Sequence, residues 1–379
     1  MLKHLGIHLV AASAVLALVG PAQAETTLNV VTAGDQNMVD YVKDYLAPIF
    51  EKAHPDVKIV SVGTGPGDAG SQKIYEKLSA EKGGKASFDV LVIHQKMAGQ
   101  MVTEKMLMKY RGDIPTGKLV DSADADNALG TDVSGFVMPM FHSQTAIAYN
   151  ADMVKNPPAS YADLAKWAAA NPKQFGYNGI KGGMSGVAFV TGWIYAFGGD
   201  SDRLIKGPYD KAVESDWQKP LAELKAFNTN VTMTPGNAGT LDMLNRGEIA
   251  MGPVWVDMYY SWQADGKLPP NVKLKLIAPG MPGQPMYYAI PANSANAALA
   301  KDFIALATSP EVQGDGIVKR FSWYPGIDAK NLKGKLDQAA WDKLFTDITP
   351  ADLAAKAKPF PIASYFNDIL ENYEKSVAN

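Results

Sequence analysis

An aromatic cluster ends the stretch GEIAMGPVWVDMYYSW, which covers residues 247 to 262. Its four aromatic residues are Trp255, Tyr259, Tyr260 and Trp262. Aromatic rings stack on the apolar faces of ligands, and the preceding Gly252 would allow a close backbone approach. Core packing is the plainer interpretation of an aromatic residue in an apolar setting. We take Trp255 first and Tyr259 second as candidate ligand contacts, and we expect Pro253 to begin a helix.

Polar side chains follow two predicted strands in the first part of the chain. They are Asp35 and Gln36 after a strand at 27–33, and His94, Gln95 and Lys96 after a strand at 88–94. Ligands bind at the carboxyl ends of parallel strands, so both loops are candidate sites. Asp35 could accept two hydroxyl hydrogen bonds, as a sugar site requires, or it could cap the next helix. The loop at His94 supplies hydrogen-bonding groups for a ligand, or it is an ordinary surface loop.

A glycine-rich loop, GTGPGDAGS, occupies residues 63–71. Its glycines leave backbone N–H groups available, and we expect Ser71 to open a helix whose N-terminus attracts anions. The loop does not match a nucleotide-binding P-loop, because Gln72 and Lys73 follow Ser71 in the wrong order. Thr64 and Ser71 are therefore candidate contacts for an anion or a hydroxyl group, and a plain flexible turn is the alternative.

Strands and helices alternate along the chain, which predicts an α/β fold with parallel sheets and crossover helices. Apolar residues at helical spacing predict a helix over 38–53, and Ser160 has the chemistry of an N-cap for a helix at 161–171. A chain of 379 residues exceeds what one core usually supports, so we expect two lobes. The other predicted elements are strands at 57–63, 145–149 and 286–291 and a long helix around 216–227.

The first 24 residues have the features of a secretory signal peptide. Lys3 and His4 give a positive start, an apolar stretch runs from Leu5 to Val19, and Ala22-Gln23-Ala24 is a small-residue cleavage site. We expect cleavage after Ala24 and a periplasmic location. The sequence has no Cys, which excludes disulfides, thiol catalysis and the cysteine-linked lipid anchor of some exported proteins.

Composition and spacing argue against several classes of function. The net charge of −3 provides no basic surface for nucleic acid, and the five His residues show no paired spacing for zinc. We therefore predict no cofactor, no metal and no nucleic-acid partner. A ferric site built from the doublet Tyr287-Tyr288 is disfavoured, because neighbouring residues on a strand face opposite sides. A secreted enzyme is the rival to a binding protein. It would need a nucleophile with a base or a pair of carboxylates, and no such arrangement stands out in the sequence.

Several segments, in this order, resemble the extracellular solute-binding proteins of ABC-type importers, the broad family that includes maltodextrin-binding protein. They are the Tyr149-Asn150 strand end, NRGEIAMGPVW, SPEVQ and the final IASYFNDIL. The resemblance implies two α/β lobes joined by crossing strands, a ligand between the lobes, permease subunits in the inner membrane as partners, and a monomer. It places a ligand-stacking ring at Trp255. We expect lobe 1 at 25–146 plus 285–321 and lobe 2 at 147–284 plus 322–379.

The same resemblance adds candidate residues in the second half of the chain. Ser143 and Gln144 match a position where relatives carry a polar ligand contact, and Tyr365 matches an aromatic platform used by some members. Amphipathic packing alone would also explain Tyr365. Ser185 stands where a helix begins, so backbone N–H groups there could point into the cleft.

The sequence indicates the family more clearly than it indicates the class of ligand. Aromatic faces together with Asp, Gln, Lys and His groups favour a sugar or polyol. Sugar-binding relatives often carry a carboxylate at the Ser143–Gln144 position, and this chain does not. A phosphorylated or carboxylated compound is the first alternative, followed by a polyamine or ferric ion. For a polyamine, the plausible cleft carboxylates are Asp35, Asp68 and Asp257.

Overall fold

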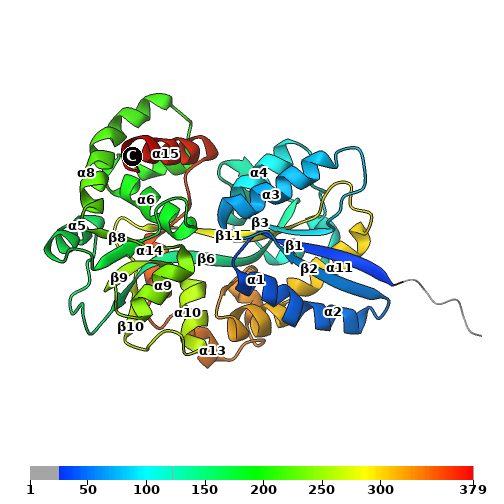
Figure 1. Cartoon of the computed structure of the whole chain (residues 1–379). Coiled ribbons are helices and arrows are strands. Elements are labelled where there is room, and N and C mark those ends of the chain that lie inside the picture. Colours follow the sequence, from blue (N-terminus) through cyan, green and yellow to red (C-terminus); the bar gives the residue numbers. More distant parts are fainter. Residues whose placement is uncertain (1–24, 122, 379) are drawn as a thin grey trace, which may run out of the picture.

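The computed structural model describes residues 25–121 and 123–378, so the predicted signal peptide lies outside the described residues. Two lobes, each with a central sheet flanked by helices, are joined by the strands β6 (Val137–Asn150) and β11 (Met281–Ala289). Figure 1 shows both strands running through the middle of the molecule from one lobe to the other. Among these residues, no helix is long and apolar enough to cross a membrane.

The remaining strands and the helices alternate as the sequence predicts. The strands are β1 Thr26–Thr32, β2 Val57–Gly63, β3 Val90–Ile93, β4 Asn127–Ala128, β5 Thr131–Asp132, β7 Phe175–Tyr177, β8 Val231–Met233, β9 Met251–Trp255, β10 Val272–Lys275, β12 Tyr324–Pro325 and β13 Ala357–Lys358. The α-helices are α1 Gln36–Asp40, α2 Ala47–Ala53, α3 Gly67–Ala80, α4 Gln95–Thr103, α5 Tyr161–Ala170, α6 Met184–Phe197, α7 Ser201–Lys206, α8 Gln218–Asn228, α9 Asn237–Asn245, α10 Val256–Ala264, α11 Ala297–Ala307, α12 Pro310–Val312, α13 Gln338–Lys343, α14 Pro350–Lys356 and α15 Ala363–Ser376. Two π-helical segments, Tyr41–Leu46 and Gln313–Arg320, continue α1 and α12.

One strand, β6, belongs to the sheets of both lobes. Its first part pairs with β11 up to Gln144, and its second part pairs with β9 from Thr145 onward, both antiparallel. The path through the described sheet is β2-β1-β3-β11-β6-β9-β7-β8, in which β1, β2 and β3 are parallel. The predicted strand at 145–149 is thus the second part of a longer strand. The lobes meet at Gln144–Thr145.

Hydrophobic clusters show which segments form each lobe. The second-lobe cluster gathers residues such as Phe189, Trp193 and Phe366 around β7 and β9. The first-lobe sheet has a cluster on each face, and Tyr287 and Tyr288 fall on opposite faces, as alternation requires. In residues 323–344, the buried apolar side chains pack in the first-lobe cluster, and the partly buried Tyr324 packs against both clusters.

Of three predictions about where helices begin, the structure confirms one and contradicts two. Ser160 caps α5 and its hydroxyl accepts a hydrogen bond from the Asp163 N–H at 3.1 Å. The prediction that Ser71 opens a helix is wrong, because α3 begins four residues earlier at Gly67. The prediction that Pro253 begins a helix is also wrong. It lies inside β9, opposite Ile147 of β6, and the helix starts only after Trp255.

A short hairpin of the first lobe reaches onto the second lobe, and we call residues 127–132 the clasp. Its tip residue Leu129 is buried in the second-lobe cluster, and the Leu129 carbonyl accepts a hydrogen bond from the Ala363 N–H at 2.8 Å. Gly130 has a φ of +88°, and a Cβ there would lie 2.9 Å from Ile362. The clasp therefore fastens the first lobe to the start of α15.

Helix α4 reinforces the same connection. The Gln95 side-chain amide donates to the carbonyl of Asn127 at 3.1 Å, which fixes the base of the clasp. The Lys96 ammonium lies 5.7 Å from the ring centre of Phe366 on α15, within the range of a cation–π contact. Figure 1 shows α4 and α15 on the same side of the crossing strands, facing each other across the lobes. Contacts remote from the crossing strands thus hold the lobes together.

We predict that Leu129→Ala shifts the unliganded protein toward an open arrangement. The substitution removes apolar contacts that exist only when the clasp is docked, worth about 2–3 kcal/mol. Small-angle scattering should show a larger radius of gyration without ligand, and ligand affinity should fall because less of the protein is closed. Met153→Ala, at an exposed Met in the second lobe, is the matched control. An unchanged radius and affinity would mean that the clasp does not govern closure.

Candidate functional site

A small cavity lies between the lobes, on one face of the ribbon formed by β6 and β11, and we call it the central cavity. Its volume is about 30 Å³, so the lobes are nearly closed upon it. The polar side chains that line it are Asp35, His94, Ser143, Asn237, Asp257 and Gln284, and the larger apolar ones are Met38, Phe141, Trp255, Met258 and Met286. Both lobes contribute, and several of these residues follow the carboxyl end of a strand, where α/β folds bind ligands.

Asp35 lies three residues after the end of β1 and stands at the N-cap position of α1, but its side chain makes no capping hydrogen bond. Its carboxylate instead accepts a hydrogen bond from the Asn237 amide of the second lobe at 3.4 Å. The structure therefore does not show the helix-capping role that was one of the two predicted for Asp35; the other, binding of ligand hydroxyl groups, stays a prediction. Burial raises the pKa of Asp35, and the hydrogen bond from Asn237 partly offsets this effect.

Asp257 supplies the second carboxylate of the cavity, from the first turn of α10. It lies two residues after Trp255, whose backbone leaves the sheet and starts the helix. The Ser143 hydroxyl of β6 donates a hydrogen bond to this carboxylate. Burial raises the pKa of Asp257 to about 7, with a smaller contribution from the negative charge of Asp35, and the Ser143 hydrogen bond opposes the rise. Two carboxylates thus face one small cavity.

His94 is buried at the first-lobe wall, at the N-cap of α4. Burial lowers its pKa, and the negative charge of Asp68 works in the opposite direction, so the ring is neutral near pH 7. The Ser71 hydroxyl lies 3.0 Å from His94 Nδ1 and also accepts a hydrogen bond from the His94 backbone N–H at 3.1 Å. Ser71 is therefore a support for His94 and is itself absent from the cavity lining.

Asn237 connects the second-lobe wall to the first lobe. Its side-chain oxygen accepts hydrogen bonds from the Ser185 hydroxyl at 2.7 Å and from the Asn178 amide at 3.0 Å. These contacts orient the side chain so that its N–H₂ group points to Asp35. Ser185, a predicted contact, thus acts on the cavity through Asn237. Sequence analysis missed Asn237, although the Pro-Gly pair before it and the strand-to-helix change at that point were visible signals.

Other predicted residues lie away from the central cavity. Gln36 is exposed and donates to Asp40, and the Thr64 hydroxyl donates to the carbonyl of Gly70 at 3.0 Å within its own loop. Tyr259 is buried in the second-lobe core, where its hydroxyl donates to Asp347 at 2.8 Å. Tyr365 is buried in the same core and accepts a hydrogen bond from the Asp210 N–H.

Three further predicted residues lie near the cavity but turn away from it. Lys96 points to Phe366, and Gln95 points to the clasp. Gln144 faces the opposite side of β6 from Ser143, and its amide donates to the carbonyl of Met281 at 2.7 Å. The structure therefore gathers Asp35, His94, Ser143 and Trp255 at one cavity. Sequence analysis named Asp257 only as a possible carboxylate for a polyamine.

The cavity is negatively charged and partly aromatic. Within residues 25–121 and 123–378, no Lys or Arg side chain lines it. Across the same ranges, no group of three or more His, Asp or Glu residues could hold a metal ion. Such a lining can bind a positively charged or hydroxyl-bearing molecule by hydrogen bonds to the carboxylates, with the apolar part against Trp255 and the methionines.

Comparisons with known proteins identify the fold and the family. The profile of the bacterial extracellular solute-binding protein family matches residues 46–325. A γ-aminobutyric acid-binding protein of Pseudomonas aeruginosa is 27% identical over 168 residues, and this match spans only 44% of either chain. The structure of the spermidine/putrescine ABC transporter substrate-binding protein of Streptococcus pneumoniae has a TM-score of 0.67 at 16% identity, covering 93% of this chain and 99% of that one.

A sugar-bound structure resembles the chain as closely. The ABC transporter solute-binding protein of Thermotoga lettingae, bound with α-D-tagatose, has a TM-score of 0.73 at 15% identity and covers 93% of this chain and 94% of that one. At such identities these structures establish the two-lobe fold and leave the ligand open. The profile match, by contrast, covers well over half of the sequence. The chain therefore belongs to the family of bacterial extracellular solute-binding proteins.

Proposed function

We propose that this protein binds a small organic cation carrying a primary amine in the central cavity and delivers it to the permease of an ABC-type importer in the inner membrane. The observation that carries the proposal is the pair Asp35 and Asp257, one carboxylate from each lobe, at a cavity with no basic lining residue among those described. The protein acts as a carrier and not as an enzyme. Its location in this proposal is the periplasm.

The physical reason is charge compensation. A carboxylate removed from water is strongly destabilised unless a positive group or hydrogen-bond donors compensate it, and here burial already raises the pKa of both acids. An ammonium group supplies one positive charge and three N–H donors, enough to serve both carboxylates at once. Trp255 offers a ring face for a cation–π contact, worth about 2 kcal/mol when water is excluded. Met258 and Met286 suit the aliphatic part of such a ligand.

The alternatives from the sequence fit this lining less well. A phosphorylated or carboxylated ligand would bring negative charge to one buried and one half-buried carboxylate, and Lys96, the expected partner for an anion, is directed to Phe366. A neutral sugar could use the carboxylates and Asn237 as hydrogen-bond acceptors and donors, but it would leave both negative charges uncompensated. Two similar proteins, a γ-aminobutyric acid-binding protein and a spermidine/putrescine-binding protein, are named for ligands with a primary amine, although γ-aminobutyric acid carries a carboxylate as well.

Asp257→Asn tests the charge directly. Calorimetry with a panel of mono- and diamines, sugars and organic phosphates should show that an amine binds the unchanged protein and loses at least about a hundredfold in affinity in the variant, since the ammonium loses a buried partner. A neutral sugar should lose much less, because Asn still offers a hydrogen-bonding oxygen. Asp216→Asn, at an exposed position, is the matched control. Binding of a sugar with no amine bound would reject the proposal.

The same variant should stabilise the unliganded protein at alkaline pH. The native pKa of Asp257 is raised from 3.8 to about 7, so the native state holds a proton there that the unfolded state releases between these pH values. The contribution of Asp257 to the free energy of unfolding therefore falls as pH rises from about 4 to 7. We expect Asp257→Asn to have a higher Tm than the unchanged protein at pH 8 and a similar Tm at pH 4.

Affinity for the amine should also depend on pH. The ammonium requires an ionised Asp257, whose pKa of about 7 in the unliganded protein means that binding at lower pH must release a proton. We expect affinity to be about 30-fold weaker at pH 5.5 than at pH 8.5. Calorimetry at pH 6.5 in buffers of different ionisation enthalpy should detect proton release. Binding without release of a proton would place the ligand away from Asp257.

A further inference from the structure

A second and larger cavity lies on the opposite face of the β6–β11 ribbon, and we call it the reverse pocket. Its volume is about 460 Å³, within the range of small-molecule sites. Alternation along β6 separates the two cavities: Phe141 lines the central cavity, whereas His142 and Gln144 line the reverse pocket. Ser143 and Gln284, which pair across the strands, border both. The ribbon is thus a thin wall between two sites.

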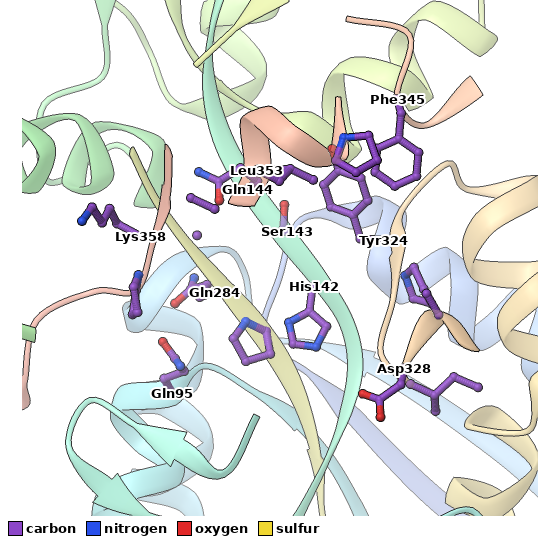
Figure 2. A pocket seen from close by; sticks show the side chains of 18 of the residues that line it. Gln95, His142, Ser143, Gln144, Gln284, Tyr324, Asp328, Phe345, Leu353 and Lys358 are labelled. Carbon is purple, nitrogen blue, oxygen red and sulfur yellow. The ribbon is translucent and has the colours of Figure 1, made fainter. Parts of the chain in front are cut away.

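One side of the reverse pocket is an aromatic and aliphatic wall. The rings of Tyr324 and Phe345 are stacked with centres 5.7 Å apart, and Trp341 packs at 5.1 Å from Phe345. Ile327 and Leu353 extend this apolar surface. Figure 2 shows Tyr324 and Phe345 together at the upper right, and Gln95 and Gln284 to the left of β6. A flat or ring-shaped molecule would find apolar contact along this wall.

Several polar groups of the pocket are uncharged amides, and one of them, Gln95, has unused hydrogen-bonding capacity. Gln95 is only 5% exposed, and its side-chain oxygen has no hydrogen-bond partner, while its N–H₂ group is held by the clasp. Gln284 is 7% exposed and adds a second amide to the lining. Figure 2 shows the ends of Gln95 and Gln284 near each other. A buried amide without partners is unfavourable, so a ligand that supplies a donor and an acceptor would be stabilised here.

The charged residues at the pocket are already compensated. The Asp328 carboxylate accepts a hydrogen bond from the Asp121 N–H at 2.9 Å, and Lys358 lies 3.8 Å from Asp202. The reverse pocket therefore offers no net charge for a ligand, in contrast to the two carboxylates of the central cavity. The two faces of the ribbon select for different chemistry.

We propose that the reverse pocket is a second ligand site, specific for an uncharged nitrogen heterocycle whose edge carries an adjacent donor and acceptor. The unpaired side-chain oxygen of Gln95 would accept a hydrogen bond from the donor of that edge, and the amide of Gln284 would donate to its acceptor. The ring would lie against the wall of Tyr324, Phe345 and Leu353. This site does not depend on the amine proposed for the central cavity, because it uses the opposite face of the ribbon.

Occupancy of the reverse pocket should be coupled to closure of the lobes. Trp341 and Phe345 pack against the first-lobe cluster, whereas Leu353 packs against the second-lobe cluster. A molecule between them contacts both lobes and therefore binds the closed arrangement more tightly than the open one. By linkage, the heterocycle and the central ligand should each increase the affinity of the other by the same factor.

The test uses adenosine and nicotinamide as probes, with the mature full chain. Calorimetry and thermal shift should show saturable 1:1 binding of at least one probe, and Leu353→Trp, which fills the pocket, should weaken it at least about tenfold, equivalent to 1.4 kcal/mol. Ala355→Trp, at an exposed position of the same helix α14, is the control and should bind the probe normally. An unchanged Tm of Leu353→Trp without probe would show that the variant is folded.

Three outcomes would overturn the proposal. One is the absence of saturable binding of both probes to the unchanged protein at millimolar concentration. Another is equal probe binding by Leu353→Trp, which would place the probe elsewhere. The third is competition between a probe and the central ligand, which would mean that both occupy one site. Failure of amine binding alone would reject the proposed function and leave this site standing, since probe binding is measured without amine.

Discussion

Two carboxylates held out of water at one small cavity are the constraint on which the site depends. Each lobe contributes one of them, Asp35 after β1 and Asp257 at the start of α10. Like charges in a poorly solvated space repel, so the closed arrangement is favourable only when something compensates them. In the described structure the compensation is partial and comes from Asn237, Ser143 and the protonation that a pKa of about 7 allows. A bound cation would complete it, which links ligand charge to the position of the lobes.

The crossing strands and the clasp oppose this repulsion, because they keep the lobes close enough for the cavity to form. In the ribbon of β6 and β11, β6 changes its pairing partner at Gln144–Thr145 from β11 to β9. The clasp at 127–132 adds contacts at a distance from this point, through Leu129 and Ala363. The balance between repulsion at the cavity and attraction at the clasp sets how much of the empty protein is closed, and therefore its apparent affinity.

Sequence analysis predicted the parts of the structure that depend on local pattern. The alternation of strands and helices, the N-cap at Ser160 and the opposite faces of Tyr287 and Tyr288 follow from periodicity and side-chain chemistry, and the structure confirms them. The direction of a side chain at a strand end does not follow from the sequence in the same way. Ser143 and Gln144 are adjacent, yet only the first faces the central cavity, because the pairing register of β6 decides the side.

Long-range contacts explain the remaining differences. The loop residue Lys96 was expected to reach a ligand, but its partner Phe366 lies on a helix at the other end of the chain. The buried apolar side chains of the segment 323–344 pack in a core that includes residues near the N-terminus, and its Tyr324 also packs against the second-lobe cluster. Asn237 gains its role from Asp35, which no local pattern around either residue reveals.

The pairing of β3 with β11 has a consequence for the order in which the protein folds. Ile93 lies opposite Tyr287, so the first-lobe sheet stays incomplete until the segment that follows most of the second lobe is available. Most second-lobe strands, by contrast, come from one continuous stretch between β6 and β10. Pairings between distant segments form slowly. The strands β1, β2 and β3 are therefore synthesised first, but their sheet is completed last. Until β11 pairs with β3, the edge of that sheet at β3 stays unpaired.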